Sequence, residues 1–181
     1  MNSKCAPKIK DTIRSQKEWG NRTPIAPNLL VLHSTESGPN TGQAVSNYLA
    51  RPQVEADCHY VVDSDGDVYE LVPRNRKAWH VASLNNRALG IEQVGRAAQQ
   101  SWPTAQLEVV AQLLAFLSYH ERIPLRSSFG GRGGVTKHSR LGANGGGHHD
   151  PGTKYPFRKV LRMARRHKRK CYGSVRAYAK G

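Results

Sequence analysis

Two histidines and an aspartate, His148, His149 and Asp150, stand together in the glycine-rich segment GGGHHDPG. Two further histidines precede them: His33 ends the apolar run LLVLH, and His138 begins the segment HSRLG. Neutral imidazole and carboxylate are good zinc ligands, and a catalytic zinc takes three protein ligands while leaving a fourth position open. The sequence therefore contains enough donors for a metal site, but residue types alone leave open which of them would bind.

Short apolar runs bounded by turn residues predict the strands that must position these side chains. The run LLVLH at residues 29–33 is typical of a buried strand that delivers a histidine at its end. Residues 88–95, ALGIEQVG, predict a second strand with Glu92 in its middle. Between them, residues 57–73 alternate on both sides of an Asp-Gly pair, which is a hairpin signal. These strands would carry the candidate residues.

Three helices are expected around the strands. Residues 41–52 suit a helix that Pro52 stops, and residues 101–124 give the clearest helix, with Thr104 as a candidate cap. Residues 155–170 are expected to be helical as well. The glycine-rich residues 127–152 are interpreted as one long loop, which in a small domain is more often functional than idle. The resulting order of elements, β-α-β-β-β-α-loop-α, predicts an α/β fold with a mixed central sheet flanked by helices.

Charge divides the chain unevenly. Residues 1–150 hold 17 Lys and Arg against 13 acidic residues, whereas residues 151–181 hold 11 Lys and Arg and no acidic residue. A chain of 181 residues is long enough for one domain with a core but too short for two full ones. We therefore predict an N-terminal arm over 1–28, a folded domain over 29–165 and a mobile basic tail over 166–181.

The three cysteines, Cys5, Cys58 and Cys171, lie far apart and form no CxxC pair. This spacing indicates neither a disulfide framework nor a thiolate zinc site. We expect free thiols, with Cys58 buried in its apolar run. A bridge between Cys5 and Cys171, near the two ends of the chain, is the alternative.

The order and spacing of several motifs resemble those of the type 2 N-acetylmuramoyl-L-alanine amidases, zinc enzymes that share a fold with the peptidoglycan recognition proteins. The resemblance runs from about residue 29 to residue 157. Its landmarks are VLHST, HYVVDSDGDVYELVP, KAWHVAS, LGIEQVG, WPTAQ, HSRLG and HHDPGTKYPF. It implies a peptidoglycan recognition protein-like fold and hydrolysis of the amide between N-acetylmuramic acid and L-alanine. The domain over 29–165 would then be the catalytic domain.

Carried over position by position, the resemblance selects one metal-binding set from the open alternatives. The family's zinc ligands match His33, His138 and Asp150, the last because it precedes Pro and Gly. Zn²⁺ is therefore the expected cofactor. His149 would lie between two functional positions and face solvent.

The same resemblance assigns two catalytic residues. Glu92 matches the strand glutamate that assists the attacking water, and Cys58 stands where some phage members have a tyrosine, which raises the weight on Glu92. His148 stands where many members have a lysine that faces the substrate carbonyl and others have a histidine. This departure matters because an imidazole, unlike an ammonium group, is not reliably charged near neutral pH. His148 would donate a hydrogen bond to the developing oxyanion.

Trp79 and His80 belong to the KAWHVAS element, which the resemblance places near the substrate groove. An aromatic ring beside an imidazole suits sugar stacking and hydrogen bonding, so both are predicted to bind substrate. A packed tryptophan is nearly as plausible a reading of the same residue types. His59, inside a hairpin strand, is expected to be a core histidine or one that supports the site.

Peptidoglycan is the partner that the resemblance implies. The basic tail could add salt-sensitive contact with anionic wall polymers or lipid, and no specific nucleic acid is expected because no base-reading motif accompanies the charge. The chain lacks an apolar span of about 20 residues and a signal-like start. These features favour a phage endolysin that waits in the host cytoplasm before lysis and then acts on the cell wall.

Two other classes of function remain open from the sequence. A non-catalytic peptidoglycan-binding module could share the fold, although the presence of all three ligand positions argues against it. A basic nucleic-acid-binding protein is the other alternative.

Overall fold

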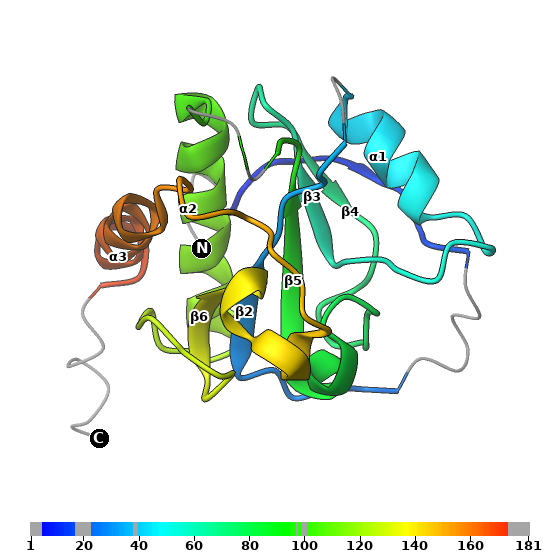
Figure 1. The fold of residues 1–181 in the computed structure, drawn as a ribbon. Coiled ribbons are helices and arrows are strands. Elements are labelled where there is room, and N and C mark those ends of the chain that lie inside the picture. Colours follow the sequence, from blue (N-terminus) through cyan, green and yellow to red (C-terminus); the bar gives the residue numbers. More distant parts are fainter. Residues whose placement is uncertain (1–4, 17–22, 38–39, 97, 99–100, 174–181) are drawn as a thin grey trace.

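The computed structural model describes residues 5–16, 23–37, 40–96, 98 and 101–173. Within these ranges six strands form one sheet, in the order β1-β4-β3-β5-β2-β6 (Figure 1). The strands are β1 (Ile9–Thr12), β2 (Leu29–Leu32), β3 (Tyr60–Val62), β4 (Val68–Glu70), β5 (Ala88–Gln93) and β6 (Gly134–Lys137). In this sheet the β3–β4 pair is antiparallel and the other neighbours are parallel. The predicted mixed sheet and hairpin are thus confirmed.

Helices cover both faces of the sheet (Figure 1). They are α1 (Gly42–Leu49), α2 (Thr104–His120) and α3 (Phe157–Tyr172), with short 3-10 helices η2 (Ala82–Arg87), η3 (His138–Arg140) and η4 (Gly142–Gly145). The helices α2 and α3 pack side by side against one face, and α1 lies on the other. The apolar stripe of α2 predicted from the sequence, Leu107, Val110, Leu114 and Leu117, is fully buried in this packing.

Side chains of β2 alternate between the two faces of the sheet, as the pleat requires. Leu30 and Leu32 enter the large core beneath α2 and α3. Leu29 and Val31 enter a smaller cluster on the opposite face, with residues of η2 and of the loop around η3. His33 is the next residue along that second face, so the alternation of β2 sends the imidazole away from α2.

The sequence prediction missed the strand β6. The segment GVTK follows three glycines within four residues, and its apolar content is a single valine, so the sequence predicts a loop there. It is a strand because β2 offers a parallel partner, with Leu30 opposite Val135. Thr104 was also predicted wrongly as the cap of α2: it is the first helical residue, and Pro103 at the cap position makes no side-chain hydrogen bond.

The structure differs from the predicted boundaries near both ends of the chain. Residues 9–12, within the predicted N-terminal arm, form β1 and pair with β4. The helix α3 continues through Tyr172, past the predicted start of a mobile tail at residue 166, and residues 174–181 lie outside the described part of the chain.

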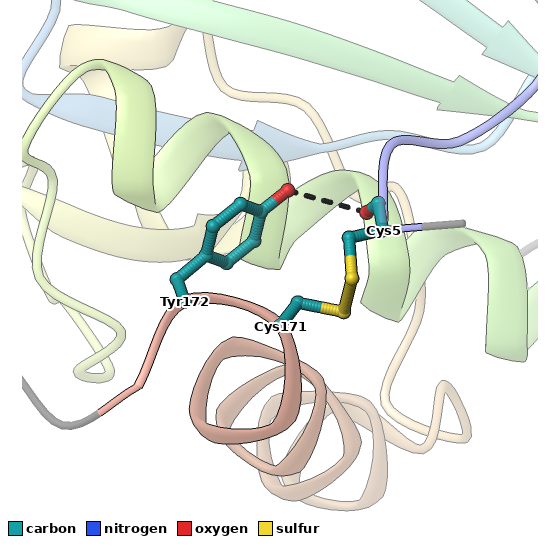
Figure 2. The surroundings of a disulfide bond; sticks show 3 residues. All are labelled: Cys5, Cys171 and Tyr172. Carbon is teal, nitrogen blue, oxygen red and sulfur yellow. Dashed lines mark hydrogen bonds between the residues drawn. A yellow bond between two sulfur atoms is a disulfide. The ribbon is translucent and has the colours of Figure 1, made fainter. Parts of the chain in front are cut away.

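A disulfide joins Cys5 to Cys171, across a sequence separation of 166 residues (Figure 2). The Tyr172 hydroxyl donates a hydrogen bond of 3.2 Å to the Cys5 carbonyl beside it. The expectation of free thiols is therefore wrong for Cys5 and Cys171, and the alternative of a bridge is correct. Cys58 is free and buried, as expected. The pairing was undecided because it depends on where α3 packs, which local sequence does not show.

No helix in the described ranges combines the length and the apolar character needed to cross a membrane.

Candidate metal centre

Three parallel strands bring the candidate residues to one edge of the sheet. In the register of β2, Leu32 lies opposite Ile91 of β5 on one side and Lys137 of β6 on the other. The next residues along these strands are His33, Glu92 and His138. Because the strands run in the same direction, their carboxyl ends present the three side chains side by side.

His33, His138 and Asp150 converge at this edge, and all three are buried. The Nδ1 atoms of the two histidines lie 3.0 Å apart. The Asp150 carboxylate places Oδ1 3.0 Å from Nδ1 of His138 and Oδ2 3.4 Å from Nδ1 of His33. Ligands at about 2.0–2.1 Å from a tetrahedral zinc lie about 3.3 Å from one another. The spacing of these three donors therefore fits a zinc ion.

Hydrogen bonds orient the donors toward a common point. Nε2 of His138 lies 2.7 Å from the Gly145 carbonyl, which can only accept, so Nε2 carries the proton and Nδ1 presents a lone pair. The Ser34 backbone N–H donates to Asp150 Oδ2 at 3.2 Å. Around bound zinc, a ligand is usually held in this way by a hydrogen bond at the ring nitrogen or carboxylate oxygen that does not bind the metal.

The protonation states of His33 and Asp150 also favour the binding of a cation. Burial lowers the pKa of His33 to about 4, so its imidazole is neutral at neutral pH. Burial by itself would raise the pKa of Asp150, but the nearby imidazoles of His138 and His33 outweigh burial and hold that pKa below its ordinary value. Near neutral pH the centre therefore offers a neutral imidazole from His33 together with a carboxylate, which are the forms that bind metal.

Glu92 lies on β5 beside this centre and lines the same cavity. Burial raises its pKa well above the ordinary value, and the negative charges of Asp150 and Glu36 raise it further. Its Oε2 atom is buried and has no hydrogen-bond partner among the described residues. An unpartnered buried carboxylate is costly, and a carboxyl group with a raised pKa beside donor atoms is typical of a catalytic site.

A cavity of about 480 Å³ opens above the three donors. His148 lines it with a side chain that is 61% exposed, and its ring stacks on His138 with the ring centres 4.3 Å apart. Trp79 and His80 also line the cavity. His149 is exposed and lines a separate hollow, so it lies outside the cluster as expected. The structure thus gathers every predicted site residue around one cavity.

His80 and His59 have partners that the sequence did not indicate. Nδ1 of His80 lies 3.0 Å from Nε2 of His33, behind the candidate ligand. His59 is buried and accepts a hydrogen bond from the Gly90 backbone at Nδ1, while its Nε2 lies 2.9 Å from the Arg76 carbonyl. His59 is therefore a core histidine, which agrees with the sequence expectation.

Sequence reasoning did not single out the side chains that hold the predicted site residues. Asn85 accepts hydrogen bonds from the backbones of His80 and Val81, at 2.9 and 2.8 Å. Gln93 donates to the His33 carbonyl at 3.0 Å. An amide side chain next to Glu92 in an apolar strand was the one available signal, because a buried amide needs partners.

Comparison with known proteins assigns the family. Residues 21–153 match the family model for N-acetylmuramoyl-L-alanine amidase, and the chain belongs to this family. One relative is N-acetylmuramoyl-L-alanine amidase A of Achromobacter lyticus, 28% identical over 111 residues. That match covers 60% of this chain and 61% of the relative, so it spans less than two thirds of the relative's length.

Solved structures share the fold at low sequence identity. The endolysin N-acetylmuramoyl-L-alanine amidase LysCS from Clostridium intestinale URNW matches with a TM-score of 0.64 and 19% identity, covering 88% of this chain and 99% of that one. The Staphylococcus aureus hydrolase AmiA, solved with its ligand, matches with a TM-score of 0.70 and 18% identity, covering 91% and 84%. The fold is therefore that of type 2 amidases, as the sequence resemblance predicted.

Proposed function

We propose that the protein is a zinc-dependent N-acetylmuramoyl-L-alanine amidase that hydrolyses the amide between N-acetylmuramic acid and L-alanine in peptidoglycan. One observation carries the proposal: the donors of His33, His138 and Asp150 converge within 4.8 Å of one another in the floor of a cavity that Glu92 also lines. Family membership supports the bond that is cleaved. The name of the Achromobacter lyticus relative supports the same reaction.

The three donors would hold Zn²⁺, since their types and spacing fit it. Bound zinc would lower the pKa of a coordinated water toward 7 and polarise the scissile carbonyl. Asp150 contributes the negative charge that favours a dication in this buried place.

Glu92 would act as the general base and then as the general acid. Its Oε2 atom has no partner among the described residues, so it is available to take a proton from the attacking water. Burial raises the pKa of Glu92, which makes its carboxylate a stronger base and allows it to keep the proton until the amine of L-alanine leaves. Atoms balance, because one water adds across the C–N bond and yields a carboxyl group and a free amine.

His148 and Trp79 would contact the substrate. The His148 ring stands at the open side of the cavity, where an N–H donor can reach the carbonyl oxygen as negative charge develops on it. One such donor typically contributes about 10²–10³ in rate. Trp79 lines the cavity at a half-buried position. Its ring suits stacking against a sugar.

The biological role we propose is lysis of a bacterial host by a phage. The name endolysin on one structural neighbour supports this role, as does the basic character of α3. In this role the enzyme would stay in the host cytoplasm until the membrane is breached.

The decisive experiment uses isolated peptidoglycan, a chelator and zinc add-back, with mass spectrometry of the new ends. We expect release of stem peptides with a free L-alanine amine, lost with chelator and restored by zinc. Asp150→Ala should bind no zinc and release nothing. Glu92→Gln should bind zinc normally and release stem peptides roughly 10²–10⁴-fold more slowly. His149→Leu, outside the cluster, is the matched control and should behave as the wild type does.

Other outcomes would change the assignment. Cleavage of glycan or of peptide cross-links would overturn the proposed bond. Retained wall binding without any cleavage would instead support a non-catalytic binding module.

A further inference from the structure

We infer that His80 positions the metal ligand His33, through a chain of hydrogen bonds that ends on the Ala88 carbonyl. This role replaces the substrate contact that the sequence predicts for His80, and it rests on the proposed metal function. Nothing in the arrangement requires His80 itself to touch a metal or the substrate.

The backbone at Ala88 determines the direction of each hydrogen bond. Nε2 of His80 lies 3.3 Å from the Ala88 carbonyl, and a carbonyl only accepts, so Nε2 carries the proton. Nδ1 of His80 then holds a lone pair, and it lies 3.0 Å from Nε2 of His33, which must donate. Neutral His33 consequently carries its proton on Nε2 and presents a bare Nδ1 to His138 and Asp150.

The fold builds a specific seat for the His80 ring. The Asn85 side chain of η2 accepts a hydrogen bond from the backbone N–H of His80 at 2.9 Å, which holds His80 just before this short helix. Beneath the ring lies Gly90, where an added Cβ would come within 2.6 Å of His80 Nδ1. On another side, His59 meets the ring edge-on with the ring centres 5.6 Å apart. A larger residue at position 90 would therefore push His80 away from His33.

These contacts leave neither ring nitrogen of His80 free for the substrate. Both ring nitrogens are within hydrogen-bond distance of protein atoms, one of them on His33 and the other on the Ala88 carbonyl. Groups that hold a zinc-binding histidine through its second nitrogen raise its basicity and fix its orientation, and their loss typically lowers metal affinity 10–100-fold. We expect a loss of metal affinity of this size when residue 80 can no longer accept the hydrogen bond from His33.

A matched pair of variants tests the inference. His80→Met and His80→Gln have side chains of similar length, but the glutamine oxygen can accept from His33 Nε2 while its amide donates to the Ala88 carbonyl. Zinc affinity of the metal-free proteins is measured by competition with a chromophoric chelator. We expect His80→Met to bind zinc 10–100-fold more weakly and His80→Gln to recover most of the wild-type affinity.

Three controls keep the result interpretable. Circular dichroism of the metal-free variants reports folding, and Gly90→Ala gives an independent displacement of His80 should His80→Met fail to fold. His149→Leu, whose side chain is outside the cluster, should keep the wild-type affinity.

Equal zinc affinity in wild type and a folded His80→Met, with a raised KM for wall fragments, would overturn the inference alone and return His80 to substrate binding. Absence of zinc binding by the wild-type protein would overturn the proposed function, and the inference with it.

Discussion

Glu92, the proposed general base, occupies a position that is unfavourable for folding stability. One of its carboxylate oxygens is buried and has no partner among the described residues. Burial raises its pKa, and repulsion from Asp150 and Glu36 adds to the effect. A buried charge without a partner destabilises a fold, so a neutral residue at position 92 should fold better.

This cost predicts a pH dependence of stability in the metal-free protein. Between the ordinary pKa of 4.5 and the raised pKa of the folded state, folded Glu92 holds a proton that the unfolded chain has released. Because the folded state then binds more protons, the contribution of Glu92 to the free energy of unfolding falls as the pH rises through this window. Glu92→Gln should therefore gain stability relative to the wild type with rising pH, measured by urea unfolding with chelator present.

Other titrating groups act in both proteins and largely cancel in the difference. His33, with a pKa lowered to about 4 by burial, contributes stability that is lost as the pH falls from 6.5 to 4. A stability difference between wild type and Glu92→Gln that stays constant across the window would contradict the prediction.

At the scale of elements, α3 has two different faces. Its buried residues, Phe157, Val160, Leu161 and Ala164, join the core beneath α2. Nearer its end, His167 lies 2.7 Å from Glu108 of α2, and Lys168 donates to Ser118. The exposed residues form a single basic stripe of seven cations: Arg158, Lys159, Arg162, Arg165, Arg166, Arg169 and Lys170. The folded helix therefore presents much of the charge that the sequence assigned to a tail.

We predict that this basic stripe strengthens attachment to anionic wall polymers. Replacing Lys159, Arg162 and Arg169 together by Gln should reduce cosedimentation with isolated walls at low salt. The difference should shrink at high salt, because counterions screen exposed charges beyond about 10 Å at 0.1 M. Hydrolysis of soluble wall fragments should be unchanged, since none of these residues lines the cavity. An identical salt dependence in the variant would contradict a role for the stripe.

At the scale of the whole molecule, the Cys5–Cys171 disulfide connects the segment before β1 to the end of α3 (Figure 2). It thereby joins the edge of the sheet to the helical layer. A crosslink across so long a loop restricts the unfolded chain, which by the chain-entropy model stabilises the folded state by up to about 5 kcal/mol. The bond is favoured in oxidising surroundings and disfavoured in a reducing cytoplasm, so in the proposed role it would form after the enzyme leaves the host cytoplasm.

Removing the bond should lower stability without disturbing the candidate metal centre. Cys5→Ser with Cys171→Ser should unfold at a lower urea concentration than the oxidised wild type, and reduced wild type should behave like the variant. Zinc affinity should be the same in all three, because neither cysteine lines the cavity. A change in zinc affinity would show that the crosslink reaches the metal centre.

The sequence by itself determined the parts of the fold that depend on local pattern. A strand or helix that buries one face needs apolar residues at a regular spacing. The strand ending at His33, the hairpin and the apolar stripe of α2 were therefore predictable. The candidate ligands could not be predicted from the local pattern. Within the HHD cluster, the choice of metal ligand stayed open until the family resemblance selected Asp150. The structure agrees with that selection, since Asp150 lies in the cluster and His149 outside it.

Only the tertiary structure decided the features that join distant segments. The strand β6 forms because β2 offers it hydrogen bonds, and the sequence GVTK has no apolar periodicity that would predict a strand. The Cys5–Cys171 bridge depends on where α3 packs. The hydrogen bond between His80 and His33 needs a glycine beneath the ring, contributed by a third segment at Gly90. Each depends on contacts between residues far apart in the chain, and such contacts leave no period or turn signal in the local sequence.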